Sequence, residues 1–404
     1  MITAEKKRRV IKVSDLNMDL ILAVYMVLAL EYDLYHFFHL KLVLPSMALT
    51  AMEIAFLIFV IITSNDRVKA HCTMYLFLLL GIAGTYLFSP ECREYLQLFF
   101  FAGSSLKKVF LLPLAVHCIN KPGKFVNRLY YFSIIEGYIH IFCNAVWGYG
   151  YTEWGVFKYM TYGAALLTPM CMVMQRVFSM PSKWNIITLI VFEVNIIVYG
   201  HRGALLISMV MFSVFFLKYV RTKNKIIIGI LGIIAFILLY IFKNALIETL
   251  ISLMTSFNLE SRTLEKLLSG DITNDSERKQ IWTIMGKGII ENFPFGKGIG
   301  ADRLLLGSAM RQGLYAHNFI FEICYNFGVM IGGIVVVCIL IMVYKSLTQI
   351  QDEDWYRLIV PFLIPAVVSL MTSGSIYQHW LFWLATGFYF CYFGRNLKDE
   401  IDGL

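Results

Sequence analysis

One short segment carries the residue types best suited to proton transfer. Residues 315–322, YAHNFIFE, stand where a long polar interval meets an apolar run. The imidazole of His317 titrates near neutral pH, so its neutral form can take a proton from a hydroxyl. Asn318 and Glu322 are four residues apart and would share a helix face. The segment predicts a general base at His317; a structural histidine at a membrane interface is the alternative.

Arg278 is a candidate for binding a phosphate group, because the planar guanidinium donates two parallel hydrogen bonds. It follows Asp275-Ser276, which predict the start of a helix over about 277–290, and Trp282 lies one turn further on. A solvated helix face is the alternative interpretation of Arg278.

Arg202 stands in the tripeptide His201-Arg202-Gly203, a very short connection between two apolar runs. An arginine held at membrane depth is costly and usually has a partner or a polar cavity. The alternative is a side chain that extends to the lipid headgroups.

Lys107 and Lys108 fall near the middle of another apolar run. Two ammonium groups at that depth need a wet cavity or an anion, unless they lie at the edge of the span. Glu193, inside a further apolar run, either neutralises a cationic site or makes an ordinary intramembrane polar contact. The cationic candidates together suit a diphosphate near the headgroups, beside a hydroxyl to be deprotonated.

The composition indicates that these residues belong to a membrane-spanning protein. Of the 404 residues, 58% are hydrophobic and 15% are charged, whereas soluble domains average about 25% charged. Apolar runs of roughly 20 residues match a helix that crosses the bilayer. The fold class expected is therefore an all-α polytopic membrane protein with about twelve spans. They are predicted at 18–37, 43–62, 71–88, 95–118, 126–145, 159–175, 184–200, 203–217, 226–242, 317–343, 358–374 and 376–393.

The basic residues of the short loops fall mostly on one side of this layout, which predicts that side to be cytoplasmic. The expected division is a cytoplasmic tail over 1–17, nine spans over 18–242, a large helical outer loop over 243–316, three spans over 317–393 and a cytoplasmic tail over 394–404. The same sidedness accounts for most of the net charge of +8 without nucleic acid.

Three patterns give no metal or nucleotide site. The eight cysteines occur singly, and none falls within the outer loop. The acidic run 352–354 has the D-x-D form but lies on the predicted cytoplasmic side. The glycines Gly296, Gly298 and Gly300 follow Pro294 without a preceding apolar strand, so they predict a turn-rich loop rather than a dinucleotide site.

The chain resembles the superfamily of O-antigen ligases and O-antigen polymerases, which are bacterial membrane glycosyltransferases. The resemblance covers most of the chain in layout, and its specific part lies within about 200–330. It rests on the order and spacing of His201-Arg202-Gly203, Arg278 with Ile281-Trp282, Pro294 to Gly300, and His317-Asn318 followed by Glu322 and Gly328.

The resemblance implies transfer of an oligosaccharide from undecaprenyl diphosphate to a sugar hydroxyl at the periplasmic face of the inner membrane, without a required metal or other cofactor. It implies that His317 acts as the base and that Arg202 and Arg278 bind the donor diphosphate. Lys107 and Lys108 are assigned to the diphosphate site for a different reason. A charged side chain within the membrane is costly unless it contacts an anion or a polar cavity. The supporting residues expected are His201, Asn318, Glu322 and Glu193.

The acceptor distinguishes two activities within the superfamily. A polymerase, the preferred interpretation, uses another lipid-linked repeat unit and could work with a chain-length regulator protein. A ligase uses lipid A–core. The preference rests on a loose match to the ligase pattern outside the His317 segment and on the aromatic-rich sequence. A transporter or lipid flippase is the alternative from another class, and a non-enzymatic anchoring protein is a third.

Overall fold

The structure is a computed structural model that describes residues 22–23, 54–55, 57–58, 69–101, 106–119, 121–147, 157–199, 202–220, 243–256, 268 and 276–402. This described part is all-helical and contains no strand. The all-α prediction is therefore confirmed for it. The predicted spans 18–37, 43–62 and 226–242 fall almost wholly outside the described residues.

Long helices occupy most of the other apolar runs. They are α4 (Lys69–Phe88), α8 (Pro122–Trp147), α9 (Phe157–Ser179), α10 (Lys183–Tyr199), α11 (Arg202–Tyr219), α17 (Phe319–Thr348), α18 (Glu353–Thr372) and α19 (Trp380–Asp402). By length and composition, α17 and α18 are the two described helices that could cross a membrane, and the apolar stretches Leu78–Phe88 and Gly203–Tyr219 are shorter. The count of twelve spans stays a prediction.

The outer-loop region contributes shorter helices. They are α13 (Lys243–Ser256), α15 (Ser276–Glu291) and α16 (Ala301–Ala309). The bounds of α15 confirm the helix predicted over 277–290. Ile247 of α13 packs against Val198 and Tyr199, at the C-terminal end of α10.

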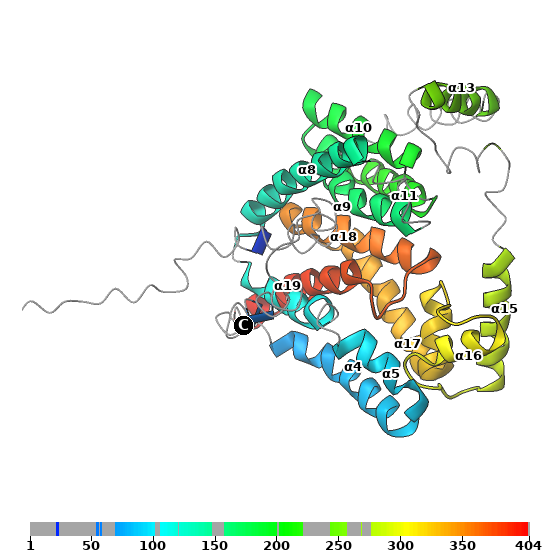
Figure 1. The fold of residues 1–404 in the computed structure, drawn as a ribbon. Coiled ribbons are helices and arrows are strands. Elements are labelled where there is room, and N and C mark those ends of the chain that lie inside the picture. The colour runs from blue at the N-terminus through cyan, green and yellow to red at the C-terminus, as the bar shows by residue number, and fades with distance from the viewer. Residues whose placement is uncertain are drawn as a thin grey trace, which may run out of the picture.

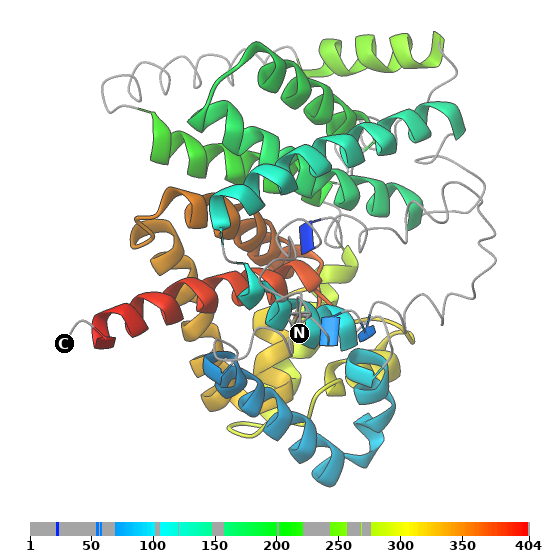
Figure 2. The same ribbon diagram turned by 90° about the vertical axis from the view of Figure 1, so that its left-hand side faces the viewer.

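Helix α18 forms the centre of the bundle. It contacts α8, α9 and α11 on one side and α17 and α19 on the other. Figures 1 and 2 show α8 to α11 as one group above α18 and α19, with α4 and α15 to α17 below. In the most apolar 18-residue stretch of α18, 72% of the residues are buried. In the corresponding stretch of α17, only 22% are buried. Helix α17 therefore presents an apolar face outward, as a lipid-facing helix does.

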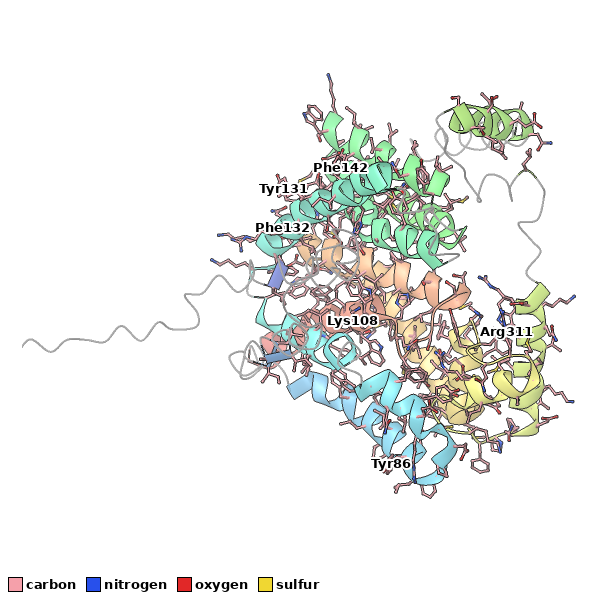
Figure 3. The ribbon with its side chains drawn as sticks, in the orientation of Figure 1. Tyr86, Lys108, Tyr131, Phe132, Phe142 and Arg311 are labelled. Carbon is pink, nitrogen blue, oxygen red and sulfur yellow. The ribbon has the colours of Figure 1, made fainter. Side chains whose placement is uncertain are left out.

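The outward faces of other helices are also apolar. Tyr86, Tyr131 and Phe142 lie at the outside of the molecule in Figure 3, and the exposed fraction of each side chain exceeds one half. Such surface is unusual in a soluble monomer and typical of a protein that contacts lipid.

Helices α11 and α18 pack together and run in opposite directions. Tyr219, at the C-terminal end of α11, donates a hydrogen bond of 2.5 Å to Glu353, at the N-terminal end of α18. Each helix is about 30 Å long. The N-terminal end of α11 must therefore lie beside the C-terminal end of α18. This places the backbone of Arg202 at the same end of the bundle as Ser373, the residue after α18.

The residues predicted to face the cytoplasm gather at the end opposite to Arg202. Arg357 pairs with Glu353 at 3.2 Å. Arg176 lies over the ring of Tyr130 near the start of α8, and Lys345 lies 5.8 Å from the centre of the Phe393 ring. One end of the bundle thus collects basic side chains from several loops, which agrees with the predicted sidedness; the compartment itself stays a prediction.

The predicted span 95–118 is not a regular helix, and this corrects the prediction. Its described parts are α5 (Arg93–Leu96), the π-helical turn η3 (Gln97–Phe101), the π-helical turn η4 (Leu106–Leu111), α7 (Leu112–Ala115) and the 3₁₀ turn η5 (Val116–Cys118). Wide π-helical turns occur frequently at functional sites. Within this segment, η4, α7 and η5 pack against α19, and α5 contacts α4.

Helix α17 is interrupted at Gly328, whose backbone has φ 82° and ψ 161°. The outer loop packs against the interruption. The N–H groups of Lys297 and Gly298 donate to the carbonyls of Tyr325 and Asn326 at 3.1 and 2.9 Å. These bonds satisfy backbone groups beside a helix interruption, which lipid could not do.

The approach of this loop to α17 depends on two glycines. A Cβ on Gly328 would lie 2.3 Å from the carbonyl oxygen of Pro294, and a Cβ on Gly296 would lie equally close to that of Asn326. The same loop is fastened to α4, because Ser89 donates to the carbonyl of Lys297 at 2.8 Å. The loop therefore joins α4 and α17 at one end of the bundle.

Candidate active site

Helix α15 positions Arg278 through Trp282, one turn later. The indole N–H of Trp282 donates to the carbonyl of Ala316 at 3.1 Å, and its ring stacks against Phe321 of α17. Ile281, on the same helix, is buried in a cluster that includes Ala316. The helix that carries Arg278 is thereby fixed to the residue before His317, which brings two sequence-predicted residues into one region.

His317 lies in the bend just before α17, and the helix itself begins at Phe319. Its φ of 52° is in the left-handed region, which is uncommon for a residue other than glycine and costs backbone energy. The imidazole is half-buried, and its ring centre is 3.9 Å from that of Tyr315. The Tyr315 hydroxyl donates to the carbonyl of Ser373. The histidine is therefore held against an ordered aromatic ring.

Asn318 and Glu322 hold the frame around the histidine. The side-chain oxygen of Asn318 caps α17 by accepting from the N–H of Ile320 at 2.9 Å. The buried carboxylate of Glu322 accepts from the hydroxyl of Ser375 at 2.5 Å and from the N–H of Ile376 at 2.9 Å. Both residues thus hold the backbone around His317, and their supporting role in the reaction stays a prediction.

Sequence reasoning missed Asp302 and Arg303, which lie at the start of α16. Asp302 is fully buried, and the side chain of Arg303 is only 9% exposed. The Arg303 guanidinium carbon is 4.6 Å from the centre of the Phe99 ring and 5.2 Å from that of Tyr315. A signal was present, because an Asp-Arg pair directly precedes the apolar run 304–306 in a loop already noted for its glycines.

A hydrogen-bonded chain connects Asp302 to the C-terminal helices. The amide of Asn326 donates to a carboxylate oxygen of Asp302 at 3.4 Å and to the hydroxyl of Tyr377 at 3.1 Å. Tyr377 in turn stacks on Phe99, with ring centres 5.4 Å apart. Residues from the outer loop, α17 and the turn before α19 thus surround one polar interior.

Arg278 also acts electrostatically on Tyr315, the residue whose ring contacts His317. Burial raises the pKa of Tyr315, while the positive charges of Arg303 and Arg278 act in the opposite direction. Burial also raises the pKa of the Asp302 carboxyl, and the neighbouring Arg303 guanidinium opposes that effect. Two cations from the outer loop therefore act on the tyrosine that contacts His317.

The structure places Arg202 only in part. It is the first residue of α11, at the end of the bundle where Tyr315 bonds to Ser373. Its side chain and the whole of His201 lie outside the described residues. Their predicted contacts with a diphosphate stay predictions.

Lys107, Lys108 and Glu193 lie elsewhere. Both lysines belong to η4, and Figure 3 shows Lys108 in the middle of the molecule, well apart from Arg311 beside α15. Glu193 of α10 accepts from the hydroxyl of Ser208 of α11 at 2.5 Å. The latter is an ordinary contact between neighbouring helices, which the sequence analysis had left open.

A chain of aromatic rings connects η4 to Tyr377. Phe110 of η4 lies 5.9 Å from Phe100, which lies 5.8 Å from Tyr377. The side chain of Lys107 lies outside the described residues. The assignment of Lys107 and Lys108 to the diphosphate site remains a prediction.

The site combines a half-buried imidazole with two guanidinium groups and two buried carboxylates at one end of an apolar bundle. Such a site can hold an anion, orient a polyhydroxylated ligand and accept a proton from a hydroxyl. The imidazole and the two guanidinium groups come from three consecutive elements, which are α15, α16 and the segment before α17.

Comparison with known proteins agrees with this geometry. Residues 186–332 match the family described as O-antigen ligase, an interval that includes Arg202, Arg278, Arg303 and His317. No curated protein matches the chain. Members of the matched family are membrane-associated, glycosyltransferase-like enzymes that use lipid-linked oligosaccharides. The match places residues 186–332 in the superfamily of O-antigen ligases and polymerases.

Proposed function

We propose that the protein is a polymerase of surface polysaccharide. It would transfer a glycan from undecaprenyl diphosphate to a sugar hydroxyl of another lipid-linked repeat unit, at the periplasmic face of the bacterial inner membrane. The observation that carries the proposal is the position of His317 beside Tyr315, with Arg278 and Arg303 acting electrostatically on the same tyrosine.

In the proposed reaction, His317 accepts the proton of the acceptor hydroxyl as its oxygen attacks the anomeric carbon of the donor. The bond from that carbon to the diphosphate oxygen breaks, and undecaprenyl diphosphate leaves. Arg202 and Arg278 would hold the leaving diphosphate, because fixed cations stabilise charge that develops during bond cleavage. This route needs neither a nucleotide sugar nor a metal ion.

Direct displacement by the acceptor oxygen predicts inversion at the anomeric carbon. The configuration of the linkage in the product, compared by NMR with that of the lipid-linked donor, tests this point. Retention would contradict displacement of the diphosphate by direct attack from the opposite face.

A ligase is the second candidate, and the family description favours it. It would differ only in its acceptor, lipid A–core. A transporter or flippase is less well supported, although helix interruptions like that at Gly328 occur in transporters. Here the outer loop fills the interruption by hydrogen bonds from Lys297 and Gly298, and polar residues gather at one end of the bundle.

A gel of the surface polysaccharide from a strain that lacks the protein separates these possibilities. A single repeat unit on the core supports a polymerase, and bare core supports a ligase. An unchanged ladder would contradict both.

A further inference from the structure

The search for unassigned chemistry leads to the interior beside His317. Arg303 has two nitrogen atoms, Nε and Nη2, that are buried and have no hydrogen-bond partner among the described residues. The Oδ2 atom of the adjacent Asp302 is also buried without a hydrogen-bond partner among the described residues. Buried polar atoms are nearly always paired, so three such atoms on neighbouring residues call for a ligand or ordered water.

The surroundings of Arg303 keep its donors available. Phe99 and Tyr315 lie against the guanidinium, 4.6 and 5.2 Å from its central carbon. Contact with an aromatic face stabilises the positive charge but uses none of the N–H groups, which lie in the guanidinium plane. Arg303 is thus a buried cation whose Nε and Nη2 donors are available to a ligand.

The hydrogen-bonding groups beside Arg303 distinguish between ligand classes. The buried Oδ2 atom of Asp302 adds an unpaired acceptor next to the two unpaired donors of Arg303. A fully ionised diphosphate accepts hydrogen bonds but cannot donate them, so it would leave Asp302 Oδ2 unpaired. A sugar hydroxyl both donates and accepts, so it can pair with the Arg303 nitrogens and with Asp302 Oδ2 together.

We propose that Arg303 and Asp302 form a subsite for the acceptor sugar, separate from the diphosphate site of Arg202 and Arg278. Tyr315 joins this subsite to the base, because its ring contacts both the His317 imidazole and the Arg303 guanidinium. A sugar held there would lie beside the tyrosine ring that contacts the proposed base. The inference rests on the proposed function and adds the location of its acceptor.

The test uses two probes with the full-length protein in detergent. One probe is undecaprenyl diphosphate, and the other is the oligosaccharide released by mild acid from the host's own lipid-linked repeat unit. Calorimetry gives a dissociation constant for each probe. Arg303→Met keeps an apolar stem but removes the donors, and Arg311→Met is the control, because Arg311 is exposed on the same loop and pairs with Glu277.

Arg303→Met should weaken oligosaccharide binding on the order of tenfold or more, since hydrogen bonds to a charged group are lost. Binding of undecaprenyl diphosphate should stay within about twofold of the wild type, and Arg311→Met should change neither. Arg278→Met should show the reverse pattern. If Arg303→Met does not reach the membrane, Asp302→Asn serves as the second variant and should also weaken only the oligosaccharide.

Two results would overturn the subsite. One is that Arg303→Met and Asp302→Asn bind the oligosaccharide as the wild type does. The other is that Arg303→Met weakens undecaprenyl diphosphate instead. Both are distinct from failure of the proposed function, which would appear as an unchanged polysaccharide ladder in the strain that lacks the protein.

Discussion

The indole N–H of Trp282 donates a hydrogen bond to the carbonyl of Ala316 at 3.1 Å. This bond joins α15, which carries Arg278, to the residue before His317. Ala316 is fully buried, so its carbonyl has no access to water if the indole is removed. The bond therefore couples the position of the proposed anion-binding residue to that of the proposed base.

Trp282→Phe should keep the stacking on Phe321 but leave the Ala316 carbonyl unpaired. An unpaired buried group costs about 1–3 kcal/mol, so polymer formation should fall by roughly tenfold or more. Polysaccharide from a deletion strain that carries the variant measures the effect. Thr283→Ala, which alters the exposed neighbour on α15, is the control and should be active. Full activity of Trp282→Phe would show that this bond does not position the site.

His317→Ala, Arg202→Ala and Arg278→Ala should each abolish the product without changing the amount of protein in the membrane. Loss of a general base typically costs about 10²–10⁴-fold in rate, and loss of a charge-stabilising donor costs about 10²–10³-fold. The ladder on a polysaccharide gel and an immunoblot of membranes are the two measurements. Lys279→Ala, at an exposed position beside Arg278, should behave as the wild type. If all three variants keep full activity, the protein is not the proposed enzyme.

Local patterns were sufficient to predict the helices of the apolar runs and the helix of the outer loop. Ser276 begins α15 one residue before the predicted start, and the short connection before Arg202 joins two helices as expected. The position of His317 at the junction of the outer loop and a long helix also followed from the change in polarity. These features depend on neighbouring residues, so the sequence carries them directly.

Features that depend on distant contacts could not be predicted. Nothing near Gly328 shows that a loop about thirty residues earlier will satisfy the interrupted α17, because that requires the approach of Gly296. The π-helical turn η4 likewise packs against α19, an element much later in the chain. Arg303 was overlooked because an arginine in a loop is normally solvated, and only the fold shows that Phe99 and Tyr315 enclose it.

Gly328→Ala should destabilise the protein strongly. The backbone at Gly328 has φ 82° and ψ 161°, a conformation nearly restricted to glycine, and the new Cβ would lie 2.3 Å from the carbonyl oxygen of Pro294. Such strain costs on the order of 1–3 kcal/mol before the clash is counted. The expected result is a lower melting temperature in detergent, or too little protein in the membrane to purify.

Gly333→Ala is the matched control for that variant. It lies in the same helix, and its new Cβ would meet nothing within 4 Å. Alanine stabilises a helix interior by roughly 0.5–1 kcal/mol relative to glycine, so the melting temperature should stay the same or rise. Equal melting temperatures for the two variants would contradict the docking of the outer loop at Gly328.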